Sequence, residues 1–119
     1  MSEPRVRVAV IDDDASVRRS VGNLLGSVGF AVEGYASAEE FLERAPTGID
    51  CLVLDLKLPK MSGFELLERL RQSQPELRVV LVTAHGGEET RRRALALGAA
   101  TFLSKPFRTD ELVTAVRGR

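Results

Sequence analysis

The stretch CLVLDLKLP, residues 51–59, decides the fold class of this 119-residue chain. Its first four residues are apolar without interruption, a pattern typical of a central parallel strand that helices cover on both faces. The run ends in Asp55, and a carboxylate at the end of a buried strand is costly to desolvate unless it has a partner. We therefore predict an α/β fold with a functional group at the carboxyl end of this strand.

Four other apolar runs flank this strand, and segments with helical spacing separate them. The five runs cover residues 6–11, 31–35, 51–54, 79–83 and 101–103. This alternation predicts five β-α units in one domain. The second run contains Glu33 and Gly34, which favours a position at the sheet edge. The expected fold is a flavodoxin-like (βα)5 three-layer sandwich, with a five-stranded parallel sheet of order 2-1-3-4-5.

The helices are indicated by apolar residues three and four positions apart. One helix is predicted over residues 15–28 and ended by Gly29, with the apolar stripe Val17, Val21, Leu24, Leu25 and Val28. Ser37 and Glu40 have the spacing of a capping box, which predicts a short helix that stops before Pro46. Three later helices are marked by Leu66, Leu67 and Leu70 before Pro75, by Ala94, Leu95 and Leu97 before Gly98, and by Leu112, Val113 and Val116 after Thr109. Each predicted strand is thus followed by a helix.

The composition excludes several classes of protein. Apolar residues make up 44% of the chain and charged residues 29%, which is ordinary for a globular protein in water. The 17 basic and 17 acidic residues cancel, so no net charge draws the chain to DNA or to an anionic membrane. Cys51 is the single cysteine, which excludes an intrachain disulfide and predicts a buried structural thiol. Because the N-terminus does not resemble a signal segment, we expect a cytoplasmic location.

Polar residues stand at the carboxyl ends of four of the five predicted strands, where ligands bind in open α/β sheets. They are Asp12-Asp13-Asp14, Asp55, Thr83 and Ser104-Lys105-Pro106. If the first and third strands are neighbours, Asp12, Asp13 and Asp55 meet. Adjacent carboxylates repel one another unless a divalent cation lies between them, so the sequence predicts bound Mg²⁺, with Mn²⁺ as an alternative. Asp14 is better explained as the N-cap of the following helix.

Five short motifs in this order resemble the response-regulator receiver domain, and the resemblance covers essentially the whole chain. They are Asp12-Asp13, LDLKLP at residues 54–59, MSG at residues 61–63, Thr83-Ala84 and Lys105-Pro106-Phe107. SAEEFL at residues 37–42 and TAHG at residues 83–86 are similar to receivers of the FixJ type, which precede DNA-binding output domains. The resemblance implies a receiver domain over residues 1–119, as the N-terminal part of a longer response regulator.

The resemblance implies a function in two-component signal transduction. Asp55 would accept a phosphoryl group from a sensor histidine kinase. The protein would then be a signalling phosphoryl acceptor that catalyses its own phosphorylation and dephosphorylation, and not a conventional enzyme. Mg²⁺ would be bound by a set of oxygen ligands, namely Asp13, Asp55, the backbone carbonyl of Lys57 and, through water, Asp12. Lys105 and the Thr83 hydroxyl would hold phosphoryl oxygens, because positioning and charge neutralisation dominate phosphoryl transfer.

The same resemblance implies a conformational switch. The Thr83 hydroxyl would turn toward the phosphoryl group and Phe102 would rotate into the space behind it, although an apolar strand residue also fits a plain core position. The surface of the fourth helix, fifth strand and fifth helix would then control a homodimer or an output domain, and contact with DNA would come only through that domain. Gly86 and Gly87 permit unusual backbone angles and mobility beside the switch, although two glycines also fit an ordinary turn.

Further residues are expected to act around the site or at the output surface. Lys57 and His85 would influence hydrolysis of the phosphorylated form, although His85 beside two glycines also fits a solvated loop. The Lys105-Pro106 peptide bond is expected to be cis by resemblance alone. Charges of both signs near the output surface could support pairing of two copies, although most such charge runs are simply solvated. They belong to Glu88, Glu89, Arg91, Arg92, Arg93, Asp110 and Glu111.

The sequence also allows two other functions. A haloacid-dehalogenase-like phosphatase would use Asp12 of the Asp12-x-Asp14 pair as its nucleophile, with Thr83 and Lys105 as phosphate ligands. This alternative leaves Asp55 without a role. A receiver fold could also serve as a phosphorylation-independent binding module, but such a module need not keep every charged residue of the site.

Overall fold

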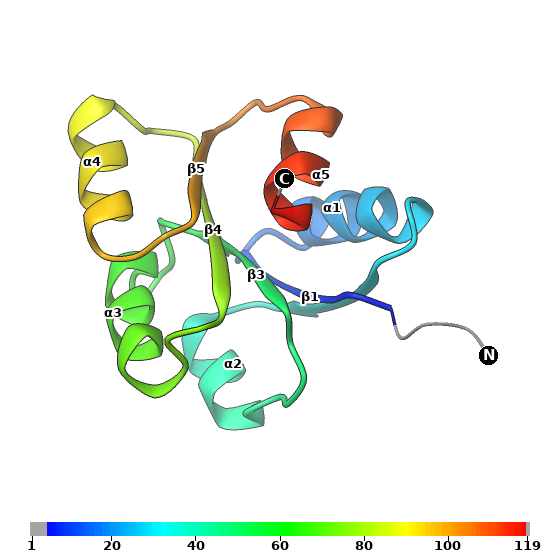
Figure 1. Cartoon of the computed structure of the whole chain (residues 1–119), viewed down its shortest axis with the longest axis horizontal. Coiled ribbons are helices and arrows are strands. Elements are labelled where there is room, and N and C mark those ends of the chain that lie inside the picture. The colour runs from blue at the N-terminus through cyan, green and yellow to red at the C-terminus, as the bar shows by residue number, and fades with distance from the viewer. Residues whose placement is uncertain (1–4, 119) are drawn as a thin grey trace.

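Within residues 5–118, which the computed structural model describes, five parallel strands form one sheet and a helix follows each strand (Figure 1). The strands are β1 (Arg7–Ile11), β2 (Ala31–Tyr35), β3 (Cys51–Asp55), β4 (Arg78–Thr83) and β5 (Thr101–Ser104). Their order is β2-β1-β3-β4-β5. The predicted strand order and the edge position of β2 are therefore confirmed.

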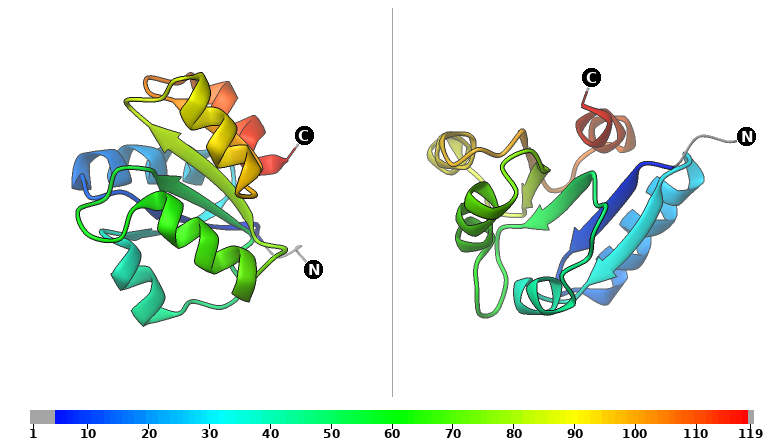
Figure 2. Two further views of the ribbon diagram at one scale, coloured as in Figure 1. Left: turned by 90° about the vertical axis from the view of Figure 1, so that its left-hand side faces the viewer. Right: turned by 60° about the horizontal axis from the view of Figure 1, so that its bottom comes forward.

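The helices cover both faces of the sheet and complete three layers (Figure 2). They are α1 (Ala15–Ser27), α2 (Ala38–Arg44), α3 (Gly63–Ser73), α4 (Glu88–Ala96) and α5 (Thr109–Arg117). α1 and α5 pack on one face, and α2, α3 and α4 pack on the other. A crossover between parallel strands must pass over a face of the sheet, so the β-α alternation leads to this arrangement. No helix in the described part of the chain is long and apolar enough to cross a membrane.

Successive residues of each strand contribute to two separate cores, since strand side chains alternate between the faces. In β3, Leu52 and Leu54 pack with α2, α3 and α4, whereas Cys51 and Val53 pack with α1 and α5. All four are at most 2% exposed. Burial raises the pKa of the Cys51 thiol to about 12, so it stays protonated at neutral pH and is the buried structural thiol that the sequence predicted. The strand therefore reaches Asp55 through fully apolar surroundings.

Three apolar residues differ from the prediction and lie at the surface. Val6 precedes β1 and is 42% exposed, and Val28 follows α1 as its C-cap and is 40% exposed. Gly29, with a φ of 100°, ends this helix as predicted. Leu95 is 37% exposed because α4 rests on the sheet through Ala94, and adjacent helical residues point about 100° apart. The elements are correct, and one end each of β1, β3, β4, β5 and α1 differs from the prediction by one residue.

Two S-x-x-E segments begin helices, and they do so differently. Ser37 Oγ accepts the Glu40 N–H at 3.0 Å, as the predicted capping box requires, but the Glu40 carboxylate accepts the N–H of Ala36 and not that of Ser37. Half of that prediction is therefore wrong. A complete capping box joins Ser62 and Glu65 at the start of α3, which sequence reasoning overlooked although the spacing is the same.

Candidate functional site

The carboxyl ends of the strands bring three buried polar side chains together at one end of the sheet. Asp12 directly follows β1, Asp55 ends β3 and Thr83 ends β4, and they are 3%, 7% and 1% exposed. Among residues 5–118 they are the only buried polar or charged side chains. Because buried polar groups are costly without partners, their concentration in one place makes this end of the sheet the candidate functional site.

Asp13 completes an acidic group with Asp12 and Asp55, as the sequence predicted. One carboxylate oxygen of each residue lies within 4.8 Å of the other two. Asp13 is exposed, so the group opens to solvent on one side. Oxygen donors at this spacing fit a hard divalent cation such as Mg²⁺ or Mn²⁺, which would also offset their mutual repulsion. Asp14 takes no part, because its Oδ1 accepts the Ser16 N–H at 2.8 Å and caps α1, as predicted.

Lys105 binds the two buried carboxylates. Its Nζ lies 3.0 Å from Asp12 Oδ2 and 3.4 Å from Asp55 Oδ2. Burial lowers the pKa of Lys105, but hydrogen bonding and attraction to the two carboxylates outweigh this effect, so the pKa is raised and the amine stays cationic. The Lys105 backbone N–H donates to the Thr83 carbonyl at 2.8 Å, which fixes the residue beside β4. The Lys105-Pro106 peptide bond is cis.

Burial raises the pKa of Asp55, and repulsion from Asp12 acts in the same direction. The Lys105 ammonium and the Lys57 N–H, which donates to Asp55 Oδ1 at 3.1 Å, lower the pKa without cancelling the shift. The Lys57 side chain itself is exposed. Two buried carboxylates thus share one ammonium, and the ionised form of Asp55 is costly in the metal-free fold. A divalent cation would remove that cost.

Asp55→Asn is expected to raise the thermal unfolding midpoint of the metal-free protein at pH 7. A folded-state pKa above the unfolded value means that the fold favours the protonated acid, so the parent loses stability as the pH rises through that pKa. The neutral asparagine avoids this loss. The gain should shrink as the pH falls and Asp55 becomes protonated, and also when Mg²⁺ is added. Thermal unfolding in buffer with a chelator measures the difference in midpoint between the parent and Asp55→Asn, and equal midpoints at pH 7 would contradict the prediction.

The loop between β3 and α3 is held close to Asp55 by tight backbone packing. The Gly63 N–H donates to the Leu56 carbonyl at 2.9 Å. A Cβ on Gly63 would lie 2.6 Å from the Asp55 carbonyl oxygen and 2.8 Å from Leu56 Cα, so only glycine fits without a shift of the backbone. On the outer side of the loop, the Glu39 carboxylate of α2 accepts the Met61 N–H at 2.8 Å. The loop is therefore fixed both at the strand and at a helix.

Thr83, Phe102 and Gly86 pack together between β4 and β5. The Thr83 hydroxyl accepts the N–H of His85 at 3.1 Å, and His85 is otherwise exposed. A Cβ on Gly86 would lie 2.8 Å from Cε2 of the partly buried Phe102 ring and 2.9 Å from the Thr83 methyl group. Gly86 therefore leaves room for the ring. Neither Gly86 nor Gly87 has a positive φ, so the unusual backbone angles that the two glycines would permit are not adopted here, as in an ordinary turn.

Other contacts around the site have no counterpart in the sequence analysis. Arg18 Nη1 donates to the backbone carbonyl of Asp12 at 2.6 Å, and helical spacing gives no sign of this bond. Glu39 was visible only as part of SAEEFL, and Gly63 only as part of MSG. For Gly63, the available signal was a glycine at the first position of a helix, shortly after a polar strand end.

The chain matches the model of the response regulator receiver domain over residues 8–117. Nodulation protein W of Bradyrhizobium diazoefficiens is 43% identical over 110 residues, which are 92% of this chain and 48% of that protein. Transcriptional regulatory protein FixJ of Azorhizobium caulinodans is 42% identical over 111 residues, which are 92% of this chain and 53% of that protein. The chain thus spans about half the length of these curated relatives.

A solved structure agrees with these matches. The BeF3-activated DrrB receiver domain has a TM-score of 0.88 to this chain, at 29% identity, and the match covers 96% of both chains. The family match excludes the haloacid-dehalogenase-like phosphatase. Lys105 binds both Asp12, the nucleophile in that alternative, and Asp55. The resemblance seen in the sequence is confirmed, and this chain belongs to the response-regulator receiver family of two-component signalling.

Proposed function

We propose that this receiver is a Mg²⁺-dependent phosphoryl switch in which Asp55 accepts the phosphoryl group from a sensor histidine kinase. The observation that carries the proposal is the grouping of Asp55 with one ammonium and two further carboxylates, those of Lys105, Asp12 and Asp13, at the carboxyl end of β3. The activation of the DrrB receiver by BeF3 supports it, because BeF3 bound to a carboxylate has the shape and charge of a phosphoryl group.

The oxygen donors of the site have separate tasks in this proposal. Mg²⁺ would be held by Asp13, Asp55 and the Lys57 carbonyl, with Asp12 acting through water. When bound, the cation would neutralise the carboxylates and the phosphoryl oxygens. The three carboxylates are hard donors, and Asp13 is exposed, which suits a cation that keeps part of its water shell.

Phosphoryl transfer requires an ionised Asp55 and stabilised phosphoryl oxygens. A carboxylate oxygen of Asp55 attacks phosphorus, the new O–P bond forms as the P–N bond to the donor histidine breaks, and the electron pair leaves with the imidazole. Lys105 Nζ, 3.4 Å from Asp55 Oδ2, and the Thr83 hydroxyl would donate to the phosphoryl oxygens. The exposed side chains of Lys57 and His85 would tune the later attack of water.

The phosphorylated state would be reported through Thr83. Its hydroxyl accepts the His85 N–H in the structure, and turning toward a phosphoryl group would end that bond. Phe102 and the Thr83 methyl group both lie against Gly86, so the ring would follow into the vacated space. α4 has a single fully buried residue, Ala94, and would therefore shift at little cost.

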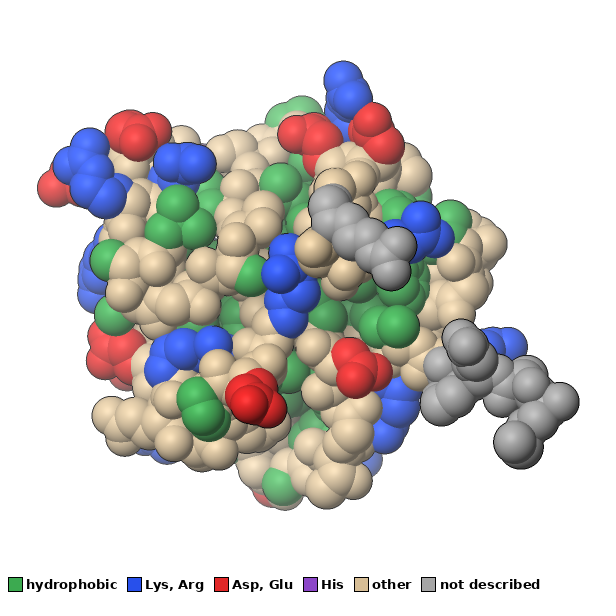
Figure 3. All heavy atoms as spheres, in the orientation of Figure 1, with side chains coloured by type: hydrophobic (Ala, Val, Ile, Leu, Met, Phe, Trp, Pro, Cys, Tyr) green, Lys and Arg blue, Asp and Glu red, His purple; other side chains and the backbone are tan. Residues whose placement is uncertain are grey.

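The surface of α4, β5 and α5 has charges of both signs, which favours self-complementary pairing. Figure 3 shows acidic and basic side chains over α4 and over the start of α5, with apolar groups between them. Exposed ion pairs join Arg91 to Glu88 at 3.8 Å and Arg108 to Asp110 at 2.6 Å. Arg93 lies over the Phe64 ring, 4.2 Å from its centroid, so one arginine of the predicted charge cluster is used within the chain.

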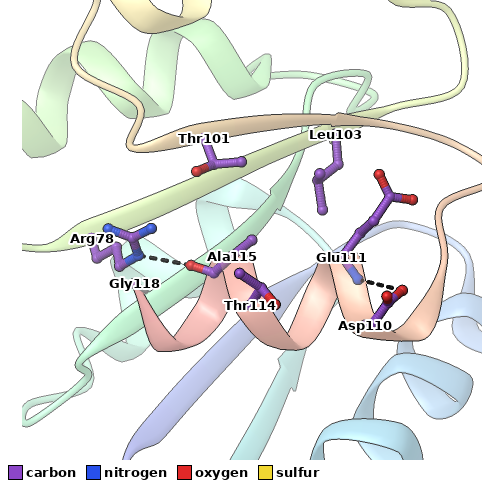
Figure 4. A pocket seen from close by; sticks show the side chains of 8 residues that line it. All are labelled: Arg78, Thr101, Leu103, Asp110, Glu111, Thr114, Ala115 and Gly118. Carbon is purple, nitrogen blue, oxygen red and sulfur yellow. Dashed lines mark hydrogen bonds between the residues drawn. The ribbon is translucent and has the colours of Figure 1, made fainter.

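An open hollow of about 460 Å³ lies between β5 and α5 (Figure 4). It is lined by Arg78, Thr101, Leu103, Asp110, Glu111, Thr114, Ala115 and Gly118. At one end, Arg78 Nε donates to the Ala115 carbonyl at 2.8 Å. The phosphorylated receiver would form a homodimer through α4, β5 and α5, and this hollow would receive part of the partner.

The output of the switch would be transcriptional, and the protein would act in the cytoplasm. The curated relatives are about twice as long as the region that matches, and FixJ is named a transcriptional regulatory protein. This receiver would accordingly control an output domain. Because its own basic and acidic residues cancel, contact with DNA would come through that domain.

Incubation with acetyl phosphate followed by intact-mass spectrometry tests the proposed function. The parent is expected to gain one phosphoryl group in Mg²⁺ and none in the presence of a chelator, because the acidic group needs a divalent counter-charge. Asp55→Asn should remain unmodified. Asp14→Asn is the matched control, since asparagine also caps a helix, and it should be labelled like the parent.

Two other results would contradict the proposal. An adduct that survives Asp55→Asn but disappears in Asp12→Asn would move the acceptor from β3 to the end of β1. No adduct in the parent, together with no trapping by beryllofluoride, would favour a phosphorylation-independent binding module.

A further inference from the structure

We propose that Glu39 is a positioning residue for the Mg²⁺ site, because its carboxylate fixes the loop after β3 and, through that loop, the Lys57 carbonyl. The inference rests on the proposed function, in which the loop supplies a ligand. Glu39 lies in the first turn of α2, an element that contributes no carboxylate to the acidic group. Its role would therefore be to hold the loop and not to touch the cation.

The hydrogen bond that supports this role joins two separate elements. Glu39 Oε2 accepts the Met61 N–H at 2.8 Å, and 22 positions separate the two residues. The left view of Figure 2 shows the loop from β3 to α3 next to the start of α2. The backbone N–H groups of Glu39 itself and of Met61 lower the pKa of the Glu39 carboxyl, so the acceptor is ionised at neutral pH. A charged acceptor makes such a bond stronger than a neutral one would be.

Few other bonds hold this part of the loop. In the part of the chain that the structure describes, residues 57–61 take part in two hydrogen bonds to other residues. One runs from the Lys57 N–H to Asp55, at the acidic group, and the other runs from the Met61 N–H to Glu39. Apolar side chains of the loop also pack against the core. Glu39 is therefore the outer anchor of a segment whose inner end carries the proposed carbonyl ligand.

A fixed loop matters because ordering a mobile ligand costs conformational entropy at the moment the cation binds. α2 is a firm support for the anchor. Ser37 caps its first turn, and Ala38 and Phe41 are 0% and 3% exposed in the core. Groups that orient metal ligands without binding the metal typically change its affinity by about 10- to 100-fold when they are removed. Glu39 is expected at the lower end, since the loop keeps its core contacts.

The test compares Mg²⁺ binding by isothermal titration calorimetry in the parent, Glu39→Ala and Glu39→Gln. Glu39→Ala is expected to weaken binding about tenfold. It should also speed hydrogen exchange of the Met61 and Lys57 amides, because both report the loop. Glu39→Gln should recover affinity to within about threefold, since its amide oxygen can still accept the Met61 N–H.

Glu40→Ala is the matched control. Glu40 is the next residue of α2, and its carboxylate also accepts a backbone N–H, that of Ala36 at 3.2 Å, but it does not hold the loop. This variant should lose a comparable amount of helix stability and keep the Mg²⁺ affinity of the parent. Thermal unfolding of each variant establishes that the fold is retained before binding is compared.

Each alternative result is decisive. Equal Mg²⁺ affinity in Glu39→Ala and the parent would overturn the inference and leave the proposed function intact. An equal loss in Glu40→Ala would also overturn it, because the effect would then reflect general loosening of α2. Unchanged exchange of the Met61 amide in Glu39→Ala would show that the bond does not order the loop. A parent that binds no Mg²⁺ would overturn both the inference and the proposed function.

Discussion

A loss of about 10²-fold in the rate of phosphoryl transfer is expected when Lys105 is replaced by methionine. The ammonium lies 3.0 Å from Asp12 Oδ2 and 3.4 Å from Asp55 Oδ2, so its removal takes a donor away from the phosphoryl oxygens. It also raises the pKa of Asp55 further, because attraction to Lys105 is the largest effect that lowers it. Methionine keeps the length and the apolar stem of lysine, so the packing around the site is retained.

Mg²⁺ affinity should respond to Lys105→Met in the opposite direction. Lys105 and a divalent cation compete for the same carboxylates, so the variant should bind Mg²⁺ at least as tightly as the parent. Intact-mass time courses with acetyl phosphate give the rate, and calorimetry gives the affinity. Lys60→Met is the matched control, because Lys60 is exposed, and it should change neither quantity. Labelling of Lys105→Met at the parental rate would remove Lys105 from the mechanism, and loss of both properties would indicate a collapsed site.

Replacing Gly63 by alanine is expected to destabilise the fold by about 3 kcal/mol, because the added methyl group overlaps backbone that has no room to move. The Cβ would lie 2.6 Å from the Asp55 carbonyl oxygen and 2.8 Å from Leu56 Cα. Leu56 is tied on both sides, since its N–H donates to the Val82 carbonyl at 2.8 Å and its carbonyl accepts the Gly63 N–H at 2.9 Å. The strain would also displace Asp55, so the rate of labelling by acetyl phosphate should fall with stability.

Gly26→Ala is the control for the Gly63 substitution, and it should act with the opposite sign. Gly26 lies in α1, and a Cβ there would have no atom within 4 Å. Alanine in a helix costs less conformational entropy than glycine, so the fold should gain about 0.5–1 kcal/mol. Denaturant unfolding measures both variants. A Gly63→Ala protein as stable as the parent would contradict this prediction. It would mean that β3 and the loop can move apart without cost, although two hydrogen bonds hold Leu56.

The strands and helices could be predicted from the sequence because they depend on local periodicity. Residues 51–54 contain no polar side chain, and every position of β3 is buried. The stripe of the first predicted helix placed Val21 and Leu25 in the core correctly. The error at Val28 lies at the end of that helix, where the chain turns away and the side chain loses its cover. Periodicity alone does not locate such a turn.

The acidic residues of the site were also visible in the sequence, because residues that end neighbouring parallel strands must meet at one edge of the sheet. The roles of Asp55, Thr83 and Phe102 came from the resemblance to receivers and not from spacing. No local pattern encodes the room that Gly63 and Gly86 leave for their neighbours.

The tertiary structure alone decided which distant side chains come into contact. Lys105 Nζ meets Asp12 across 93 positions, and the Glu39 carboxylate meets the Met61 N–H across 22. A periodic pattern records which face of one element is buried. The distance between side chains of different elements, in contrast, depends on how the helices and loops pack against the sheet, and no single segment of the sequence carries that information.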